Sequence, residues 1–386
     1  MQGSTASINR ELGVTMITSE ADRTKVGVHA LLIGVGKYPH LTGGKSKQQF
    51  PHAGDIGQLT SPYHSVEAFA DWLRTGLNRP GTPLRSLRVL ASSPVKGKAT
   101  HGWDEPTIAN IRKAVSDWNK DCDHHSGNLA LFYFCGHGVV LGETTALLAQ
   151  DFGKEVDSPF LGSFDPAALA DACMASKASK QLFLLDACRS TPPELRSKYK
   201  TPTLPELLTP KVHSNQGSHQ QAELYASELG ANAFGVDDKP SVFMSSLLTS
   251  MKGTGALQNE DEDWVVGTAS LRTGLDWLVK RAYGKDLQRV AFGKMSADFA
   301  LHTVVGTPSV AVTVKTRPLA KLAELHLQTD CPQYRPVPDG KPWCIDVPAG
   351  NRSFYAGDAA NPKQFSHHEQ LAPQFRVISI PCGDDQ

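Results

Sequence analysis

The chain has 386 residues, enough for one large domain or two. Its 39 Lys and Arg residues balance its 39 Asp and Glu residues, so the net charge does not indicate binding to nucleic acid or to an anionic membrane. Because no apolar run approaches the roughly 18 residues of a membrane helix, and residues 1–27 lack the apolar segment of a signal peptide, we expect a cytoplasmic protein with neither a membrane nor a nucleic-acid partner.

The first half of the chain alternates between two apolar patterns. After a polar tail over residues 1–26, short apolar runs predict buried strands, and apolar residues spaced by three and four predict helices with one buried face. The predicted strands are residues 29–35, 86–91, 128–139 and 180–185, with a hairpin arm at 144–148. The predicted helices are residues 63–78, a segment capped by Asp104 and a segment opened by Asp165 and Pro166. This alternation predicts parallel strands with helices on both faces of the sheet.

The composition changes after Ser190. Residues 191–221 carry five prolines and many polar side chains, which predicts a flexible linker. Beyond it we expect a short strand, two helices and a sixth sheet strand, at residues 223–227, 241–252, 268–282 and 298–305. The sequence Gly306-Thr307-Pro308 then indicates a boundary. Short apolar runs at 310–314, 323–327 and 376–380 predict that residues 306–386 form a small all-β domain.

The seven cysteines predict neither disulfides nor a metal site. Their odd number, in a chain without a secretory signal, indicates free thiols in a reducing compartment. Cys331, Cys344 and Cys382 lie late in the chain, but no C-x-x-C pair accompanies them, so we expect no zinc. We likewise expect no cofactor.

Two of the predicted strands end in side chains suited to catalysis. Residues 180–190, KQLFLLDACRS, lead to Cys188, and residues 128–139, NLALFYFCGHGV, lead to His137 between two glycines. The carboxyl ends of parallel strands are where open α/β sheets place their chemistry. A thiol and an imidazole there predict a nucleophile and its general base. Cys135, which is in phase with His137 on the same strand, is expected to be core packing.

These residues resemble a known family. Asp-Ala-Cys-Arg-Ser around Cys188 is similar to the caspase pattern Gln-Ala-Cys-[Arg/Gln/Gly]-Gly, and His137 lies 51 residues upstream, close to the caspase spacing of about 50. Over residues 27–305 the chain resembles caspase-type cysteine proteases in the wide sense that includes metacaspases, paracaspases and bacterial relatives. The resemblance implies an α/β fold, a six-stranded mostly parallel sheet with helices on both faces. It also implies an oxyanion bound by the backbone N–H groups of Gly138 and Cys188, and it aligns residues 191–221 with the stretch between subunits that is cleaved on activation.

The predicted specificity depends on Asp186. Caspases that cleave after Asp carry Gln two residues before the nucleophile, whereas metacaspases and paracaspases carry Asp. Asp186 therefore implies cleavage after basic residues, with Arg preferred for its two parallel hydrogen bonds to a carboxylate; a role in fixing the loop is the alternative. The second pocket Asp usual in metacaspases is replaced by Pro-Tyr-His-Ser at residues 62–65. A basic specificity makes four linker residues candidates for self-cleavage: Arg196, Lys198, Lys200 and Lys211.

The expected activity is that of a cysteine endopeptidase acting on protein substrates. Many bacterial proteases of this type act in stress or antiphage defence and stay inactive until a signal releases them. By that resemblance, residues 306–386 are expected to bind an activator, either a nucleotide-like second messenger or a sensor protein. Two alternatives remain: a protease of this fold with non-basic specificity, and a non-enzymatic scaffold that keeps the fold.

Overall fold

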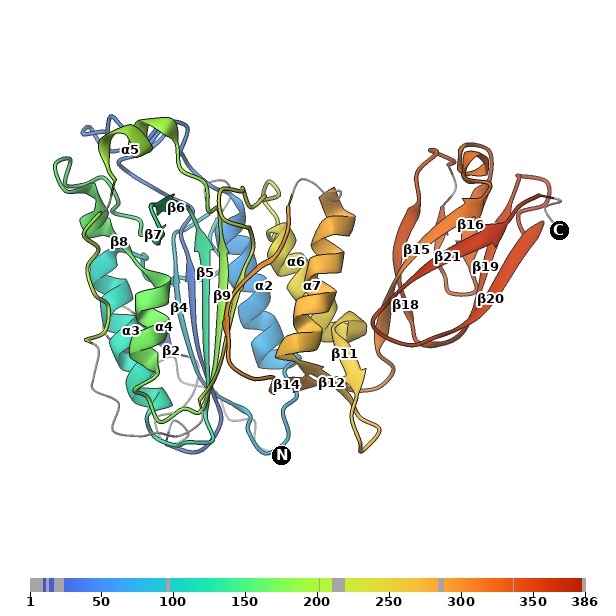
Figure 1. Cartoon of the computed structure of the whole chain (residues 1–386), viewed down its shortest axis with the longest axis horizontal. Helices are drawn as coiled ribbons and strands as arrows, with labels where there is room; N and C mark the ends of the chain where they lie inside the picture. The colour runs from blue at the N-terminus through green and yellow to red at the C-terminus, as the bar shows by residue number, and fades with distance from the viewer. Residues whose placement is uncertain are drawn as a thin grey trace. The chain divides into compact units, whose positions relative to one another are not determined.

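The computed structural model describes residues 10–11, 14–16, 24–94, 98–200, 202–209, 219–283, 288–335 and 337–383 (Figure 1). The chain forms two compact units, residues 1–245 with 282–299 and residues 246–281 with 300–386. Within the described ranges, no helix is both long and apolar enough to span a bilayer.

The first unit is built on an eight-stranded sheet in the order β1-β2-β4-β3-β5-β9-β10-β13. The five strands from β4 to β10 are parallel, whereas β13 and β2 pair antiparallel at either side of them. The bounds are β1 Arg10–Glu11, β2 Val14–Met16, β4 Leu84–Ala91, β3 Val28–Gly34, β5 Leu129–Gly136, β9 Lys180–Ala187, β10 Gln220–Tyr225 and β13 Ala291–Met295. The six strands from β4 to β13 confirm the predicted mostly parallel sheet, and the β1–β2 hairpin extends it with residues from the predicted polar tail.

Helices cover both faces of this sheet. Helix α2 (Ser61–Thr75) lies on one face, and α3 (Ile108–Cys122) and α4 (Pro166–Cys173) lie on the other (Figure 1). Successive strand residues point to opposite faces, so Tyr133 of β5 meets Phe69 of α2, whereas its neighbour Phe132 packs on Trp118 of α3. Both faces are buried, which is why β3 and β5 are almost continuously apolar in sequence.

One predicted helix cap is confirmed and the other is wrong. Asp165 caps α4, because its carboxylate accepts a hydrogen bond from the N–H of Ala167 at 2.8 Å. Helix α3 is capped by Thr107 and not by Asp104. The backbone of Asp104 instead forms a bridge with Leu90 at the end of β4, so the chain there is still extended.

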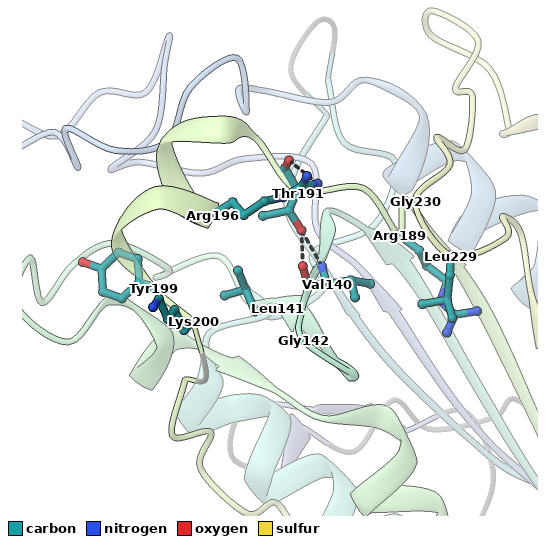
Figure 2. A pocket seen from close by; sticks show the side chains of 10 residues that line it. All are labelled: Val140, Leu141, Gly142, Arg189, Thr191, Arg196, Tyr199, Lys200, Leu229 and Gly230. Atoms are coloured by element: carbon teal, nitrogen blue, oxygen red, sulfur yellow. Dashed lines mark hydrogen bonds between the residues drawn. The ribbon is translucent and has the colours of Figure 1, made fainter.

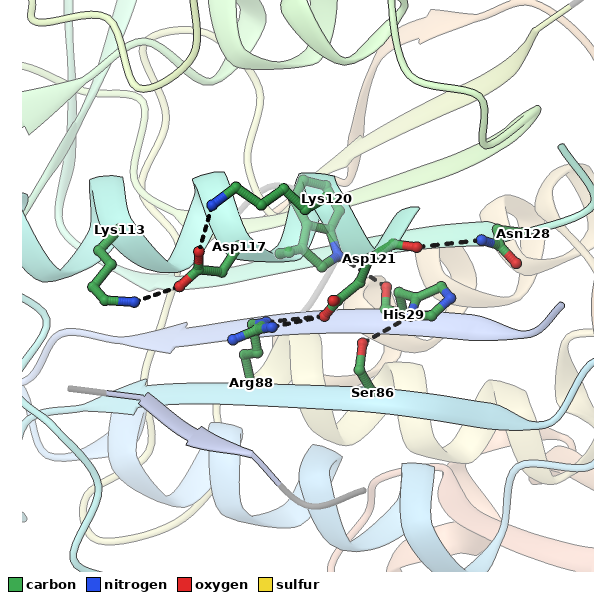
Figure 3. Close-up of polar contacts among 9 residues, drawn as sticks. His29, Ser86, Arg88, Lys113, Asp117, Lys120, Asp121 and Asn128 are labelled. Atoms are coloured by element: carbon green, nitrogen blue, oxygen red, sulfur yellow. Dashed lines mark hydrogen bonds and ion pairs between the residues drawn. The ribbon is translucent and has the colours of Figure 1, made fainter. Parts of the chain in front are cut away.

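A buried polar network joins α3 to strands β3 and β4 (Figure 3). Arg88 and Asp121 form an ion pair of 2.8 Å between Nη2 and Oδ2, with both side chains 5% exposed. His29 Nδ1 shares a hydrogen bond of 2.8 Å with Ser86 Oγ. Burial lowers the pKa of His29 to about 4, so its imidazole is neutral in the folded protein.

A small antiparallel sheet follows β5 directly. It consists of β6 (Gly138–Leu141), β7 (Thr144–Leu148) and β8 (Ser163–Phe164), the last preceded by a 3₁₀ turn at Pro159–Gly162. The predicted hairpin arm at residues 144–148 is therefore confirmed.

The predicted linker begins with an ordered segment. Helix α5 (Pro193–Lys198) buries Leu195 completely, and Leu204 and Leu208 pack on the same core. Residues 201 and 210–218 lie outside the described residues.

The predicted sixth strand is wrong in position. Strand β14 (Ala300–Thr303), inside residues 298–305, pairs with β12 (Trp264–Gly267) in a three-stranded sheet that also contains β11 (Ala256–Gln258). The edge strand of the main sheet next to β10 is β13. None of its residues is fully buried. An edge strand of this kind lacks the apolar run by which buried strands are identified.

In the second unit, helices pack on β strands. Helix α6 (Val242–Thr249) continues as a π-helical turn (Ser250–Thr254), and most of α7 (Thr268–Tyr283) belongs to this unit. Gly253 has φ 142°, and an added Cβ would lie 2.4 Å from the amide nitrogen of Ser309, so glycine is required there. The ring of Trp277 in α7 stacks on Phe375 at 4.5 Å.

The C-terminal region is all-β, as expected. Two sheets, β18-β15-β21 and β17-β16-β19-β20, enclose a core that includes Val312, Phe354 and Ile378. The bounds are β15 Ser309–Arg317, β16 His326–Thr329, β17 Tyr334–Arg335, β18 Trp343–Pro348, β19 Gly350–Gly357, β20 Phe365–Leu371 and β21 Phe375–Pro381. The predicted strands at 310–314 and 376–380 are confirmed. The one at 323–327 is partly wrong, because Leu319–Ala323 form a 3₁₀ turn that buries Leu322.

Candidate active site

The structure brings the two predicted catalytic side chains to one pocket. Strands β5 and β9 run in register up to the pairs Cys135–Asp186 and Gly136–Ala187, so His137 and Cys188 leave the sheet side by side. Both line a small cavity of about 60 Å³, which we call the Asp186 pocket. Its thirteen lining residues are Leu59, Ser61, Pro62, Cys135, Gly136, His137, Asp186, Ala187, Cys188, Ala233, Phe234, Gly235 and Ser241.

His137 is held as a neutral proton acceptor. Its Nε2 lies 2.8 Å from the carbonyl oxygen of Gly57, and because a carbonyl only accepts, Nε2 carries the proton. Nδ1 is then the basic nitrogen. The backbone N–H of His137 donates to the hydroxyl of Tyr38 at 2.8 Å, and the two rings lie 4.9 Å apart. Burial lowers the pKa of His137, and the hydrogen bond to Gly57 acts in the opposite direction. The imidazole is therefore neutral near pH 7, and its Nδ1 has no proton and can accept one.

Cys188 is held as a neutral thiol. Its Sγ accepts a hydrogen bond from the N–H of Ala233 at 3.3 Å and donates to the carbonyl of the same residue at 3.4 Å. Burial raises the pKa of the thiol, with the N–H of Ala233 acting in the opposite direction. The thiolate therefore has to form as the sulfur attacks, which requires a base within reach.

The N–H of Gly138, the predicted oxyanion donor, is not used in the pairing of β6 with β7. In the β6–β7 pair, the N–H of Leu148 donates to the carbonyl of His137 at 2.9 Å, and hydrogen-bonded positions alternate along an antiparallel pair. Gly138 and Val140 therefore direct their N–H groups away from β7. The N–H of Val140 reaches the hydroxyl of Thr191, just beyond the nucleophile, at 2.9 Å. A Cβ on Gly138 would lie 2.6 Å from the carbonyl oxygen of Cys188, so glycine is needed for this close approach.

Asp186 lies at the wall of the same pocket and is 4% exposed. Its Oδ2 accepts hydrogen bonds from the hydroxyls of Tyr133, at 2.9 Å, and Ser241. Burial raises the pKa of this carboxyl to about 6, against the lowering effect of the two hydroxyls. Among the thirteen lining residues, Asp186 is the single carboxylate, and Ser61 and Pro62 line the wall near the place where metacaspases carry a second one.

The remaining predicted site residues lie in different places. Cys135 is buried in the sheet as predicted, although it also borders the Asp186 pocket, and burial raises its pKa well above the usual value. Of the self-cleavage candidates, Arg196 and Lys198 lie on α5 and Lys200 follows it, all three exposed. Lys211 lies outside the described residues. Within the described ranges, no group of three or more His, Cys, Asp or Glu side chains is arranged to hold a metal ion.

Sequence reasoning missed several partners of the dyad. Gly57, Tyr38 and Ala233 come from loops without an apolar pattern, so no sequence signal marks them. Ser241 has a partial signal. A Ser directly before an apolar helix indicates an N-cap, and its hydroxyl does accept from the N–H of Met244 at 2.9 Å; the same hydroxyl also donates to Asp186.

A thiol and a neutral imidazole at adjacent ends of parallel strands, beside a backbone N–H donor, define a cysteine peptidase built on an α/β sheet. The family model of the caspase domain matches residues 28–264, and the chain belongs to this family. It is a caspase-like cysteine protease.

The relatives are distant. The chain is 24% identical over 276 residues to an uncharacterized protein, y4kE, of Sinorhizobium fredii, and the match covers 65% of this chain and 79% of that protein. Among solved structures it is similar to caspase-1 of Spodoptera frugiperda, with a TM-score of 0.41 and 14% identity over 70% of this chain and 89% of the other. A Geobacter sulfurreducens protein gives a TM-score of 0.43 and 13% identity, covering 70% of this chain and 94% of that one.

Proposed function

We propose that this protease is an endopeptidase that cleaves after basic residues, with Arg preferred over Lys, and that His137 and Cys188 are its catalytic dyad. One observation carries the proposal: the carboxylate of Asp186 lines the same pocket as both members of the dyad. A side chain that enters this pocket from the acyl side of the scissile bond meets a buried acceptor, which favours a cation and repels an anion.

The chemistry follows from the protonation states of the dyad. His137 Nδ1 takes the thiol proton as the Cys188 sulfur attacks the substrate carbonyl carbon. The N–H groups of Gly138 and Cys188 bind the oxyanion of the tetrahedral intermediate. The imidazolium then gives its proton to the leaving amine, and a water molecule hydrolyses the thioester after losing a proton to the same nitrogen.

The pocket has to widen to admit its substrate. At about 60 Å³ it is smaller than an arginine side chain, and Ala233 holds the nucleophile through both its N–H and its carbonyl. Substrate entry therefore displaces the segment that contains Ala233 from the thiol. The hydroxyls of Tyr133 and Ser241 remain to orient the carboxylate, and a rigid guanidinium forms two hydrogen bonds with it where an ammonium forms one.

The test is a set of fluorogenic peptides that differ only in the residue before the scissile bond: Arg, Lys, Gln or Asp. We expect kcat/KM to fall in the order Arg, Lys, Gln, with no turnover of Asp and none of any peptide by Cys188→Ala. Equal turnover of Gln and Arg peptides would establish a non-basic specificity. The absence of a Cys188-dependent signal would favour the scaffold.

We further propose that the enzyme is a regulated effector of a bacterial stress or antiphage response, activated by a signal bound at the C-terminal β region. The signal is a nucleotide-like second messenger or a sensor protein. The support for this proposal is that the β region has a core of its own. Calorimetric titration of the full chain with cyclic nucleotides, alongside peptide turnover, tests it. Binding without a change in turnover counts against a regulatory role.

Self-cleavage of the linker at Arg196, Lys198, Lys200 or Lys211 is a related proposal. Its support is the position of these basic residues, directly after the nucleophile segment and, for the described ones, on the surface. Intact masses of the active protein and of Cys188→Ala decide it, because a nick at one of the four sites should appear only in the active protein.

A further inference from the structure

A second, larger pocket lies beside the nucleophile. It has a volume of about 570 Å³ and is open to solvent along the β6 strand and the turn that follows it (Figure 2). Its ten lining residues are Val140, Leu141, Gly142, Arg189, Thr191, Arg196, Tyr199, Lys200, Leu229 and Gly230, and we call it the cationic pocket. It shares no lining residue with the Asp186 pocket.

Three of the lining side chains are cations and none is an acid. In Figure 2, Arg189 lies at one side of the pocket, Lys200 at the opposite side, and Arg196 above the strand between them. In the part of the chain that the structure describes, no ion pair joins any of the three to a carboxylate. An open pocket lined by three cations and no acid attracts anions.

Arg189 lies against the Tyr225 ring and is attracted by the nearby carboxylate of Glu223. Its guanidinium lies 4.3 Å from the centre of the Tyr225 ring, and its Nε is buried without an acceptor among the described residues. The nearby carboxylate of Glu223 is engaged by the hydroxyl of Tyr225 at 2.9 Å. Among the described residues, the Arg196 side chain bonds to the carbonyl of Thr191, at 3.5 Å. Donors without a strong acceptor in the free protein are available to a ligand.

The cationic pocket adjoins the segment that follows the nucleophile. Arg189 directly follows the nucleophile, and Thr191 bonds to Val140, which lies two residues after the oxyanion donor Gly138. The chain from Cys188 to Thr191 thus separates the two pockets. A substrate whose residue before the scissile bond occupies the Asp186 pocket, and which continues along β6, would pass over the cationic pocket.

We infer that the cationic pocket is the subsite for acidic side chains in the first residues after the scissile bond. The inference rests on the proposed function in one respect, that the residue before the bond sits in the Asp186 pocket. Carboxylates of Asp or Glu would pair with the exposed side chains of Lys200 and Arg196, and Arg189 adds positive charge at the other side of the pocket. The enzyme then recognises a basic residue followed by acidic ones.

The self-cleavage candidates of the enzyme's own linker lack this acidic pattern. Arg196, Lys198, Lys200 and Lys211 are followed by Ser-Lys-Tyr, Tyr-Lys-Thr, Thr-Pro-Thr and Val-His-Ser, none of which contains an acid. All four sites are therefore poor substrates, and any self-cleavage is slow compared with cleavage of a matched substrate protein.

The test begins with a cleavage survey on an unbiased peptide library, read by mass spectrometry. The residue before each cut tests the proposed function, and the three residues after it test the inference, so the two fail separately. Kinetics then compare two internally quenched peptides that differ only in Glu or Lys at the first three positions after the bond. We expect a Glu preference of about tenfold, since each exposed pair contributes roughly threefold and Lys replaces attraction by repulsion. The preference should shrink with added salt.

Charge-reversal variants locate the effect. Lys200→Glu and Arg196→Glu should each bring the Glu-to-Lys ratio close to one. Lys198→Glu is the matched control: it is exposed on the same helix, outside the cationic pocket, and should keep the wild-type ratio. Each ratio compares two substrates on one enzyme preparation. Any effect that the loss of a self-cleavage site has on the activity of the preparation is therefore the same for both substrates and cancels in the ratio.

Binding provides a readout without turnover. Fluorescence anisotropy of the same two peptides on Cys188→Ala should show the same preference for Glu. No acidic enrichment after the cut, enrichment only before it, an unchanged ratio in Lys200→Glu and Arg196→Glu, or equal anisotropy titrations would each overturn the inference.

Discussion

Replacing Asp186 by Asn tests the proposed specificity most directly. Asn keeps the size of the side chain and an oxygen that can accept from Tyr133 and Ser241, but it removes the charge that a substrate guanidinium would meet. Losing one partner of a buried, hydrogen-bonded charge pair costs about 2–4 kcal/mol, which corresponds to a fall in kcat/KM for an Arg peptide of roughly 30- to 1,000-fold. A Gln peptide should lose little, so the preference for Arg collapses.

The pH profile gives this variant a second readout. Because burial raises the pKa of Asp186 to about 6, the wild-type carboxyl becomes protonated as the pH falls through 6. The profile of kcat/KM reports the free enzyme, so turnover of the Arg peptide should drop by about tenfold per pH unit below that point. Burial lowers the pKa of His137, which places the loss of the general base at lower pH. In Asp186→Asn the decline near pH 6 should disappear.

The assay is peptide hydrolysis between pH 4.5 and 8, with Glu155→Gln as a control that removes an exposed negative charge elsewhere in the same unit. Retention of both the Arg preference and the decline near pH 6 in Asp186→Asn would refute the assignment of this carboxylate to the specificity pocket.

Three further predictions concern other parts of the first unit. Burial lowers the pKa of His29 from 6.5 to about 4, so the unfolded chain binds the proton more readily than the folded chain. The contribution of neutral His29 to the free energy of unfolding is fully present above pH 6.5. It should decline by up to about 3 kcal/mol as the pH falls to 4. His29→Gln should flatten that decline in denaturant titrations. Asp121→Asn leaves Arg88 buried without its counter-charge and should destabilise the fold by about 3 kcal/mol. Gly138→Ala brings a Cβ to 2.6 Å from the Cys188 carbonyl oxygen, so the backbone has to shift; the variant should lower kcat by about 100-fold and should also melt at a lower temperature than wild type.

The first two of these predictions have a matched comparison. His125→Gln alters an exposed histidine and should leave the pH dependence of stability in place. Asp117→Asn breaks exposed ion pairs on the same helix as Asp121, with Lys113 and Lys120 (Figure 3), and should change stability by less than about 1 kcal/mol. A large loss from Asp117→Asn, or none from Asp121→Asn, would mean that burial does not determine the strength of these pairs.

The sequence alone was sufficient for the central sheet and for the proximity of His137 and Cys188. Strands buried on both faces are apolar runs too short for helices, and β3, β5 and β9 are of this kind. The carboxyl ends of parallel strands meet at one edge, so a Cys and a His at two such ends were expected to be neighbours. Local chemistry was also sufficient for the cap of α4 at Asp165.

Only the tertiary structure decided what surrounds the dyad. Gly57 fixes the tautomer of His137, and Ala233 holds the thiol, yet both come from loops whose positions depend on packing and not on any periodic pattern. The edge strand β13 was not predicted from the sequence for a related reason, because a half-exposed strand has no continuous apolar run. The cationic pocket is a related case: its three cations lie within residues 189–200, but its other walls come from residues 140–142 and 229–230, which only folding brings to them. Sequence patterns record what each segment buries; which segments then face one another is decided by the folding of the whole chain.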